Sequence, residues 1–272
     1  MAEAQGIEVR REGRIAIVEI DRPAVNALSF SAYDSLRKVF DDISADLSVS
    51  VAVLTGAGER AFCAGHDVRE FVGLTPETAE LELPRVRAAF DALQGCEVPV
   101  IAAINGAAIG AGLALASLSD IRLASTNAVF ALPEIDVGVL GSASHLMRLV
   151  PQGLARLLAL TGRRLDAEAA QRVGLVEEIH APEDLRAAAL ELAREIAAKS
   201  PPALRLAKRT FNRLEELPVS AGYELECAMT ALLRRGPDAA EGASAFVHKR
   251  VAEYDFSGTP KRTEPCRSTA GE

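Results

Sequence analysis

Short apolar runs that end in a glycine turn and lead into a helical pattern are the feature of this sequence that most constrains its fold. Val51–Leu54 and Val98–Ile104 are two such runs, and each is followed within two residues by a glycine. Apolar runs of about four to eight residues between turns are typical of buried strands. Their alternation with helical segments predicts an α/β core in which helices cover sheets.

The neighbouring segments extend the same pattern. Residues 7–20 alternate apolar and polar side chains on either side of Glu12-Gly13, which predicts two strands joined by a turn. Apolar residues recur every three or four positions over residues 31–43, which predicts a helix. Further helices are expected over Leu81–Leu93 and Gly110–Ser117, and a further strand over Ala128–Leu132.

Beyond Pro151 the pattern is almost entirely helical, and the only strand expected there lies around Leu175–Ile179. We divide the chain into an α/β core over residues 1–200 and a helical region over residues 201–272. A helical region after an α/β core often packs on a neighbouring subunit. The helices expected in this half are Leu154–Leu160, Asp166–Val173, Pro182–Lys199, Pro202–Leu214 and Ser220–Arg235.

Composition and charge limit the classes of function. The 272 residues, of which 49% are apolar, suffice for a large buried core, and the net charge of −8 disfavours nucleic acid as a partner. No apolar stretch is long enough to span a membrane, and the N-terminus lacks the features of a signal peptide. The four cysteines are scattered, which favours a reduced, cytoplasmic protein without disulfides or a bound metal.

Two segments of small residues follow buried strands and can bring backbone amides close to a ligand. Residues 54–71 lead from a strand into a helix near Asp67, whose carboxylate can cap that helix. Residues 104–116 begin a helix near Gly110, and the free amides and the dipole at a helix start favour a developing negative charge. The alternative for the first segment is a tight turn, and for the second a close contact between helices.

A third segment, residues 130–149, carries a carboxylate in apolar surroundings. Glu134 stands between Pro133 and Ile135, directly after the expected strand. A glutamate that loses contact with water has a raised pKa and can serve as an acid or base. An exposed loop glutamate is the alternative.

Together and in this order, the segments resemble the enoyl-CoA hydratase/isomerase (crotonase) family. The resemblance covers roughly residues 7–250 and rests on DRPAVNALS, RAFCAGHD, NGAAIGAG, LPEIDVGV, SPPALRLAKR and EGASAFVHKR. It implies a spiral of strand-strand-helix units, followed by helices that build trimers, often paired into hexamers. It also implies an acyl-CoA thioester as substrate, with coenzyme A as part of that substrate and no other cofactor.

The resemblance assigns roles to individual residues. The amides of Ala64 and Ala111 are expected to form an oxyanion hole, in which fixed donors stabilise the enolate that develops from a thioester. Glu134 is the expected acid/base. Contacts with coenzyme A are expected from Arg22, Val25, Ala64, His66, Asp67, Gly110, Phe246 and Lys249, the last of them toward a neighbouring subunit's site.

This chain departs from the family at one catalytic position. Hydratases of the family hold a water between two glutamates, and the second lies twenty positions before the one that Glu134 matches. This chain has Ala114 there, and an alanine can neither orient a water nor accept a proton. An isomerase that converts a 3-enoyl-CoA to a 2-enoyl-CoA needs only one carboxylate beside an oxyanion hole. Dienoyl-CoA isomerases use a further aspartate where this chain has Ser142.

Three functions therefore stay open. The first is an isomerase with Glu134 as the sole base. The second is hydration, C–C hydrolysis or decarboxylation in which Glu134 works with His145 or Asp136. His145 can titrate near neutral pH, or it can be a packed or exposed helix residue. The third is a non-catalytic acyl-CoA-binding or scaffold protein, against which the retained Glu134 and both small-residue segments argue.

Overall fold

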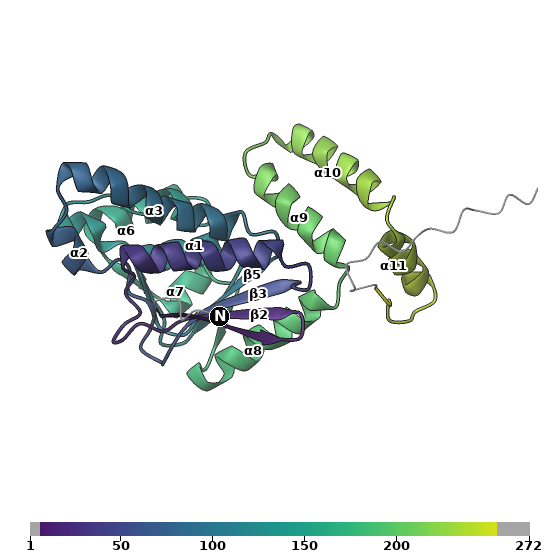
Figure 1. Cartoon of the computed structure of the whole chain (residues 1–272), viewed down its shortest axis with the longest axis horizontal. Coiled ribbons are helices and arrows are strands. Elements are labelled where there is room, and N and C mark those ends of the chain that lie inside the picture. Colours follow the sequence, from purple (N-terminus) through teal and green to yellow (C-terminus); the bar gives the residue numbers. More distant parts are fainter. Residues whose placement is uncertain (1–5, 255–272) are drawn as a thin grey trace, which may run out of the picture.

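The computed structural model of the chain describes residues 6–254, which form a six-stranded sheet, a four-stranded sheet and the helices around them (Figure 1). The large sheet has the strand order β1-β2-β3-β5-β7-β10. β1 and β2 pair antiparallel, and the later pairings in this sheet are parallel. Its strands are β1 (Ile7–Glu12), β2 (Ile15–Ile20), β3 (Val51–Gly56), β5 (Val100–Ile104), β7 (Ile121–Ser125) and β10 (Glu178–His180).

The two faces of the large sheet are buried under different helices. Val53 of β3 belongs to an apolar cluster with α8 (Pro182–Ala197), whereas Leu54 belongs to the main core under α1 (Phe30–Ala45) and α3 (Pro76–Gln94). Figure 1 shows α1 and α3 on one face of the sheet and α8 on the other. Burial on both faces explains why the central strands β3 and β5 are continuous apolar runs.

The sequence patterns indicate only one strand of the smaller sheet, the one expected over Ala128–Leu132. Each strand of this sheet is three residues long, which is too short to show a periodicity. Its order is β4-β6-β8-β9, with β4 (Ala61–Cys63), β6 (Ala107–Ile109), β8 (Val129–Ala131) and β9 (Arg164–Asp166). β9 shows that the expectation of a single strand beyond Pro151, around residues 175–179, is wrong, and the strand expected there begins at Glu178.

The chain repeats one unit, in which a strand of the large sheet is followed by a strand of the small sheet and then by a helix. β3, β4 and α2 form one such unit, β5, β6 and α4 a second, and β7, β8 and η1 a third. This order confirms the expected spiral of strand-strand-helix units. The helices not yet given are α2 (Val68–Val72), α4 (Ala111–Leu118), the 3-10 helix η1 (Pro133–Val137), α5 (Ala143–Leu146), α6 (Gln152–Thr161) and α7 (Ala167–Arg172).

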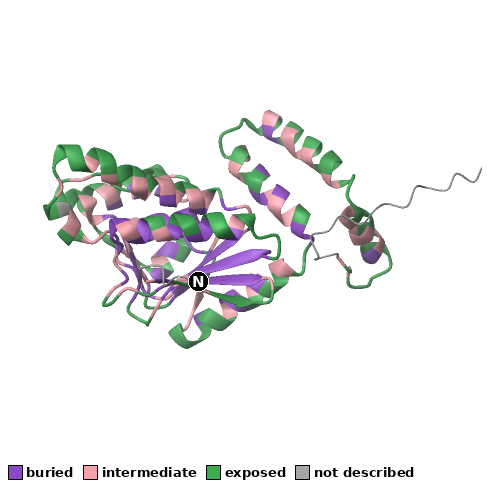
Figure 2. Ribbon diagram, in the orientation of Figure 1, coloured by how far each residue is buried: buried purple, intermediate pink, exposed green. Residues whose placement is uncertain are grey.

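The last three described helices extend away from the sheets (Figure 1). They are α9 (Pro201–Leu214), α10 (Val219–Leu233) and α11 (Pro237–Val247). Lys208 anchors α9 to the core, because its buried Nζ lies 2.7 Å from both carboxylate oxygens of Asp120. Figure 2 shows that much of α10 and α11 is exposed. The division at residue 201 stays a prediction, and residues 255–272 of its second part lie outside the described residues.

None of the described helices combines the length and the apolar character needed to cross a membrane.

Candidate active site

A cavity of about 570 Å³ lies between α3, the loop before α2, the start of α4 and the segment from η1 to α5. Much of its wall is apolar, with Leu83 and Phe90 of α3 among the contributing residues. The residues proposed from the sequence that line it are Ala64, His66, Gly110, Ala111, Glu134, Asp136 and His145. The fold therefore brings the predicted acid/base together with both small-residue segments.

These two segments approach each other closely because both consist of small residues. Gly65 has a φ of +93°, and a Cβ there would lie 2.9 Å from the carbonyl oxygen of Ile109 and 3.6 Å from the amide nitrogen of Ala111. A Cβ at Gly112 would overlap the carbonyl of Cys63. Glycine adopts such a conformation at close range without strain, so the small residues hold the loop against the start of α4.

The prediction that the amide of Ala64 forms part of the oxyanion hole is wrong, because this amide is already bonded to another segment of the chain. The amide of Ala64 donates to the carbonyl of Val25 at 3.0 Å and is therefore held within the protein. The next residues pair Leu28 with His66 in a parallel bridge, in which the amide of Asp67 donates to the carbonyl of Leu28 at 2.8 Å. In a parallel bridge the amide of the paired residue points away from the partner segment, so the amide of His66 is turned away from Leu28.

Glu134 lies close to the start of α4. A Cβ at Gly110 would lie 3.2 Å from Oε1 of Glu134, and a Cβ at Gly141 would overlap the same carboxylate. The side chain is half-buried, and this burial raises the pKa of the Glu134 carboxyl, although the nearby amides of Glu134 itself and Ser142 lower it. A carboxyl whose pKa moves toward neutrality is a more effective acid/base at physiological pH.

Helix α4 supplies backbone amides but no carboxylate. Ala114, at the position of the second glutamate of hydratases, is fully buried. The hydroxyl of Ser119 donates to the carbonyl of Leu115 at 3.0 Å, and Ser117 is buried without lining the cavity. Neither Ser117 nor Ser119 can therefore take the role of the missing glutamate in orienting a water.

The two candidate second groups differ in burial. His145 on α5 is half-buried, and its ring stands perpendicular to that of Phe90 with centroids 5.7 Å apart. Burial, with a smaller effect from the Arg148 guanidinium, lowers the pKa of His145, so the imidazole is neutral at neutral pH. Asp136 is exposed, and a Cβ at Gly162 would lie 2.8 Å from its Oδ2.

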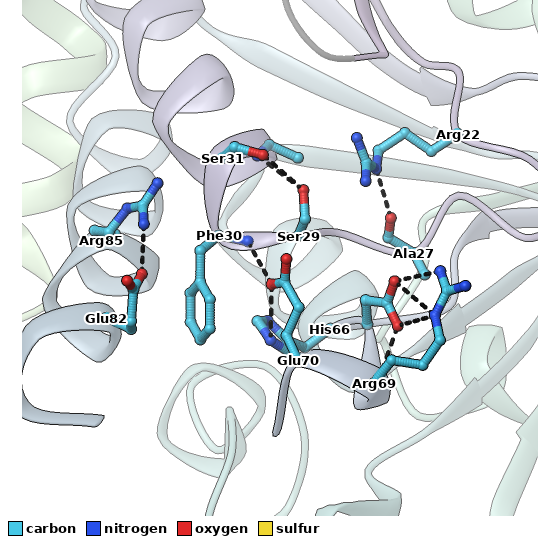
Figure 3. A network of polar contacts seen from close by, with 12 residues as sticks. Arg22, Ala27, Ser29, Phe30, Ser31, His66, Arg69, Glu70, Glu82 and Arg85 are labelled. Atoms are coloured by element: carbon cyan, nitrogen blue, oxygen red, sulfur yellow. Dashed lines mark hydrogen bonds and ion pairs between the residues drawn. The ribbon is translucent and has the colours of Figure 1, made fainter. Parts of the chain in front are cut away.

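An aromatic wall forms one side of the cavity, and the sequence does not predict the place of Tyr33 in it. Tyr33 of α1 is completely buried, stacks on the ring of His66 at 5.6 Å and meets Phe90 edge to face at 6.1 Å. Glu70 lies 3.6 Å from Nε2 of His66 and accepts a 2.8 Å hydrogen bond from the amide of Phe30 (Figure 3). Burial nevertheless lowers the pKa of His66. The one sequence signal for Tyr33 is its place on the apolar face of the expected helix.

The remaining predicted coenzyme A contacts do not line the cavity. Arg22 donates from Nε to the carbonyl of Ala27 at 2.8 Å (Figure 3), and Asp67 pairs with the guanidinium of Arg69. Phe246, which is 86% exposed, lies near the end of α11, a helix that extends away from the sheets (Figure 1), and it does not line the cavity. The roles toward coenzyme A of these residues stay predictions: Arg22, Val25, Asp67, Phe246 and Lys249.

Within residues 6–254, no group of three or more His, Cys, Asp or Glu side chains is placed to hold a metal ion. Cys63, Cys96 and Cys227 are free thiols. The expectation that the chain needs no cofactor besides the coenzyme A of its substrate stays a prediction.

Comparison with known protein families identifies the family of this chain. The sequence profile described as enoyl-CoA hydratase/isomerase matches residues 10–257. The chain belongs to the enoyl-CoA hydratase/isomerase family. The family expected from the sequence is therefore confirmed, and so is the crotonase fold.

Members of this family resemble the chain over most of its length. The crystal structure of an enoyl-CoA hydratase from Bacillus anthracis superposes with a TM-score of 0.89 at 32% identity, covering 93% of this chain and 100% of that one. A short-chain-enoyl-CoA hydratase of Clostridium acetobutylicum is 34% identical over 255 residues, 92% of this chain and 98% of its own. A (7aS)-7a-methyl-1,5-dioxo-2,3,5,6,7,7a-hexahydro-1H-indene-carboxyl-CoA hydrolase of Mycobacterium tuberculosis is 39% identical over 239 residues, 88% of this chain and 96% of its own. The chain is thus an enzyme of a family that acts on acyl-CoA thioesters.

Proposed function

We propose that the chain isomerises a 3-enoyl-CoA to the 2-enoyl-CoA, with Glu134 as its only acid/base. The observation that carries this proposal is the single half-buried carboxylate at the start of α4, with Ala114 in place of a second one. Isomerisation moves one proton from C2 of the acyl chain to C4, and one carboxylate can make both transfers. Hydration requires in addition a water that is oriented and deprotonated.

The thioester oxygen binds, in this proposal, between the amides of Ala111 and His66. Ala111 is the first residue of α4, and the first amides of a helix have no carbonyl partner inside that helix. The helix dipole adds a positive potential at the same point. Each preorganised donor aimed at a developing oxyanion stabilises the transition state by about 3 kcal/mol.

The proton path then follows from the position of Glu134. The carboxylate takes a proton from C2, the electron pair moves into the enolate held by the two amides, and the double bond shifts from C3–C4 to C2–C3. Protonated Glu134 returns the proton to C4. The apolar wall around Phe90 keeps water away from the enolate, which favours isomerisation over addition of water.

Coenzyme A binding and assembly belong to the same proposal. Arg22, Val25 and Asp67 contact the coenzyme at the mouth of the site. Phe246 and Lys249 serve the site of a neighbouring subunit in a trimer or a dimer of trimers. The exposed apolar side chains of α10 and α11 support such an assembly, and the free thiols fit a cytoplasmic enzyme.

Offering the purified protein a 3-enoyl-CoA and, separately, a 2-enoyl-CoA tests this function. We expect the 3-enoyl ester to become its 2-enoyl isomer without a change of mass, and the 2-enoyl ester to gain a water much more slowly. Fast addition of water to the 2-enoyl ester would contradict the proposal and direct the search for a second group to His145.

A second candidate is the cleavage of a C–C bond in an acyl-CoA that carries a ketone. It is favoured by the neutral His145 on the wall of the cavity, which can work with Glu134 on a water. The similarity to the Mycobacterium tuberculosis hydrolase, whose name specifies two oxo groups, points the same way. Release of a carboxylate product from a β-diketone acyl-CoA, with no turnover of the 3-enoyl ester, would favour this candidate.

A further inference from the structure

The hydroxyl of Tyr33 has no hydrogen-bond partner among residues 6–254, although its side chain is completely buried. A buried hydroxyl without a partner destabilises the folded chain relative to phenylalanine, and such groups are rare in native proteins. Tyr33 lines the active-site cavity together with Glu134 and Ala111. The side chain that carries the unpaired hydroxyl is therefore part of the cavity wall.

The ring of Tyr33 is fixed, so its hydroxyl has a defined position. One face stacks on His66 with an interplanar angle of 13°, and Phe90 stands at 78° to the ring. Burial raises the pKa of Tyr33 well above its usual value, and the carboxylates of Glu70 and Glu134 act in the same direction. The hydroxyl thus keeps its proton and can donate a hydrogen bond to a ligand.

In the proposed binding mode, the acyl chain is the part of the substrate that passes Tyr33. With the thioester oxygen between the amides of Ala111 and His66, and C2 to C4 beside Glu134, the rest of the chain extends along the wall formed by Phe90. Tyr33 packs directly against Phe90 on that wall. His145, which also contacts Phe90, is a second polar group on the wall of the cavity.

We propose that Tyr33 is a specificity-determining residue whose hydroxyl donates a hydrogen bond to an oxygen on the acyl chain beyond C3, so that the enzyme prefers acyl-CoA substrates with a hydroxyl or oxo group there. This inference rests on the proposed function, because it places an acyl-CoA in this cavity. A plain alkyl chain leaves the hydroxyl unsatisfied, whereas an oxygenated chain satisfies it. A site built in this way discriminates because its polar group is unpaired with the wrong ligand.

Binding of unreactive saturated ligands tests the inference directly. Hexanoyl-CoA and its 4-oxo and 5-oxo analogues lack the double bond, so affinity is measured without turnover. For the wild type we expect one of the oxo analogues to bind roughly two- to tenfold more tightly than hexanoyl-CoA, the range that one net hydrogen bond supplies. In Tyr33→Phe this preference disappears, while hexanoyl-CoA binds as well as before.

Ser117→Ala is the matched control, because Ser117 also has a buried hydroxyl without a partner among the described residues but does not line the cavity. This variant keeps the preference of the wild type. Equal binding of all three ligands by the wild type, or an unchanged preference in Tyr33→Phe, overturns the inference. Absence of binding of any acyl-CoA, hexanoyl-CoA included, instead overturns the proposed function on which it rests.

Discussion

Burial, more than any neighbouring charge, tunes the reactivity of Glu134. Loss of water contact is the largest cause of its raised pKa, and the amides near the carboxylate only moderate it. The base is active when deprotonated, so the rate must fall as the pH drops through this pKa. The acid limb of kcat/KM reports the pKa of the free enzyme.

We therefore predict that the acid limb of kcat/KM for a 3-enoyl-CoA has its midpoint above 4.5, the usual pKa of a glutamate. A pH–rate profile measures this midpoint. His145→Gln is the control, and it should leave the limb in place. A limb that vanishes in His145→Gln would mean that the histidine, and not Glu134, is the group that titrates.

The space around the Glu134 carboxylate leads to a second prediction. A Cβ at Gly141 would overlap that carboxylate, so Gly141→Ala must displace it. Displacements of about 1 Å in a catalytic group can lower rates by about a hundredfold, and we expect a loss of this order in kcat. Gly153→Ala on α6, where a Cβ meets no other atom within 4 Å, should keep full activity. Steady-state kinetics give kcat for the two variants. Equal values of kcat would contradict the close approach of Gly141 to the Glu134 carboxylate.

Single residues show where sequence reasoning succeeds and where it stops. The segment around Glu134 could be recognised because the residue types themselves carry the chemistry. The sequence predicts an oxyanion-hole amide at Ala64, two residues from the His66 amide that the proposed function uses, because amide direction depends on the pairing of Leu28 with His66. A similar limit applies to Tyr33, whose burial and missing partner depend on contacts between α1 and α3.

At the scale of elements, the long strands and most helices follow from local patterns, whereas only β8 of the small sheet does. The central strands β3 and β5 are almost entirely apolar because both faces of the sheet are covered there. Three-residue strands such as β4 and β9 arise from pairing with distant segments. The attachment of α9 likewise depends on a contact between Lys208 and Asp120 that no local pattern reveals.

That attachment leads to a third prediction. Lys208→Met leaves the carboxylate of Asp120, which is 24% exposed, without its buried cation, and we expect the free energy of unfolding to fall by about 3 kcal/mol. Urea unfolding measures the change. Lys38→Met, which breaks an exposed pair with Asp42 on α1, should change stability by less than about 0.5 kcal/mol. Equal stabilities of the two variants would show that the buried pair does not anchor α9.

At the scale of the whole molecule, α10 and α11 expose large apolar side chains that no other part of the described chain covers. Val219 and Tyr223 on α10 and Phe246 on α11 are 92%, 68% and 86% exposed. Large exposed apolar side chains on neighbouring helices are typical of protein interfaces. Phe246, near the end of α11, and Lys249, just beyond it, do not line the cavity of their own chain, as the proposal that they serve a neighbouring site requires.

We therefore predict that the chain sediments as a trimer or a multiple of three at micromolar concentration. Activity per chain should fall on dilution once the assembly dissociates, because Phe246 and Lys249 then leave the neighbouring site. Sedimentation velocity and activity over a dilution series test both statements. A monomer with full activity would contradict them.

The central claim is that one carboxylate, Glu134, performs both proton transfers of the reaction. Its most direct test is the rate of conversion of a 3-enoyl-CoA to its 2-enoyl isomer by the wild type and by Glu134→Gln, which keeps the size of the side chain but cannot accept the proton. We expect kcat to fall by about a hundredfold to ten-thousandfold, the usual contribution of a general base, with similar binding of the substrate. A Glu134→Gln variant that isomerises at the wild-type rate would contradict the account.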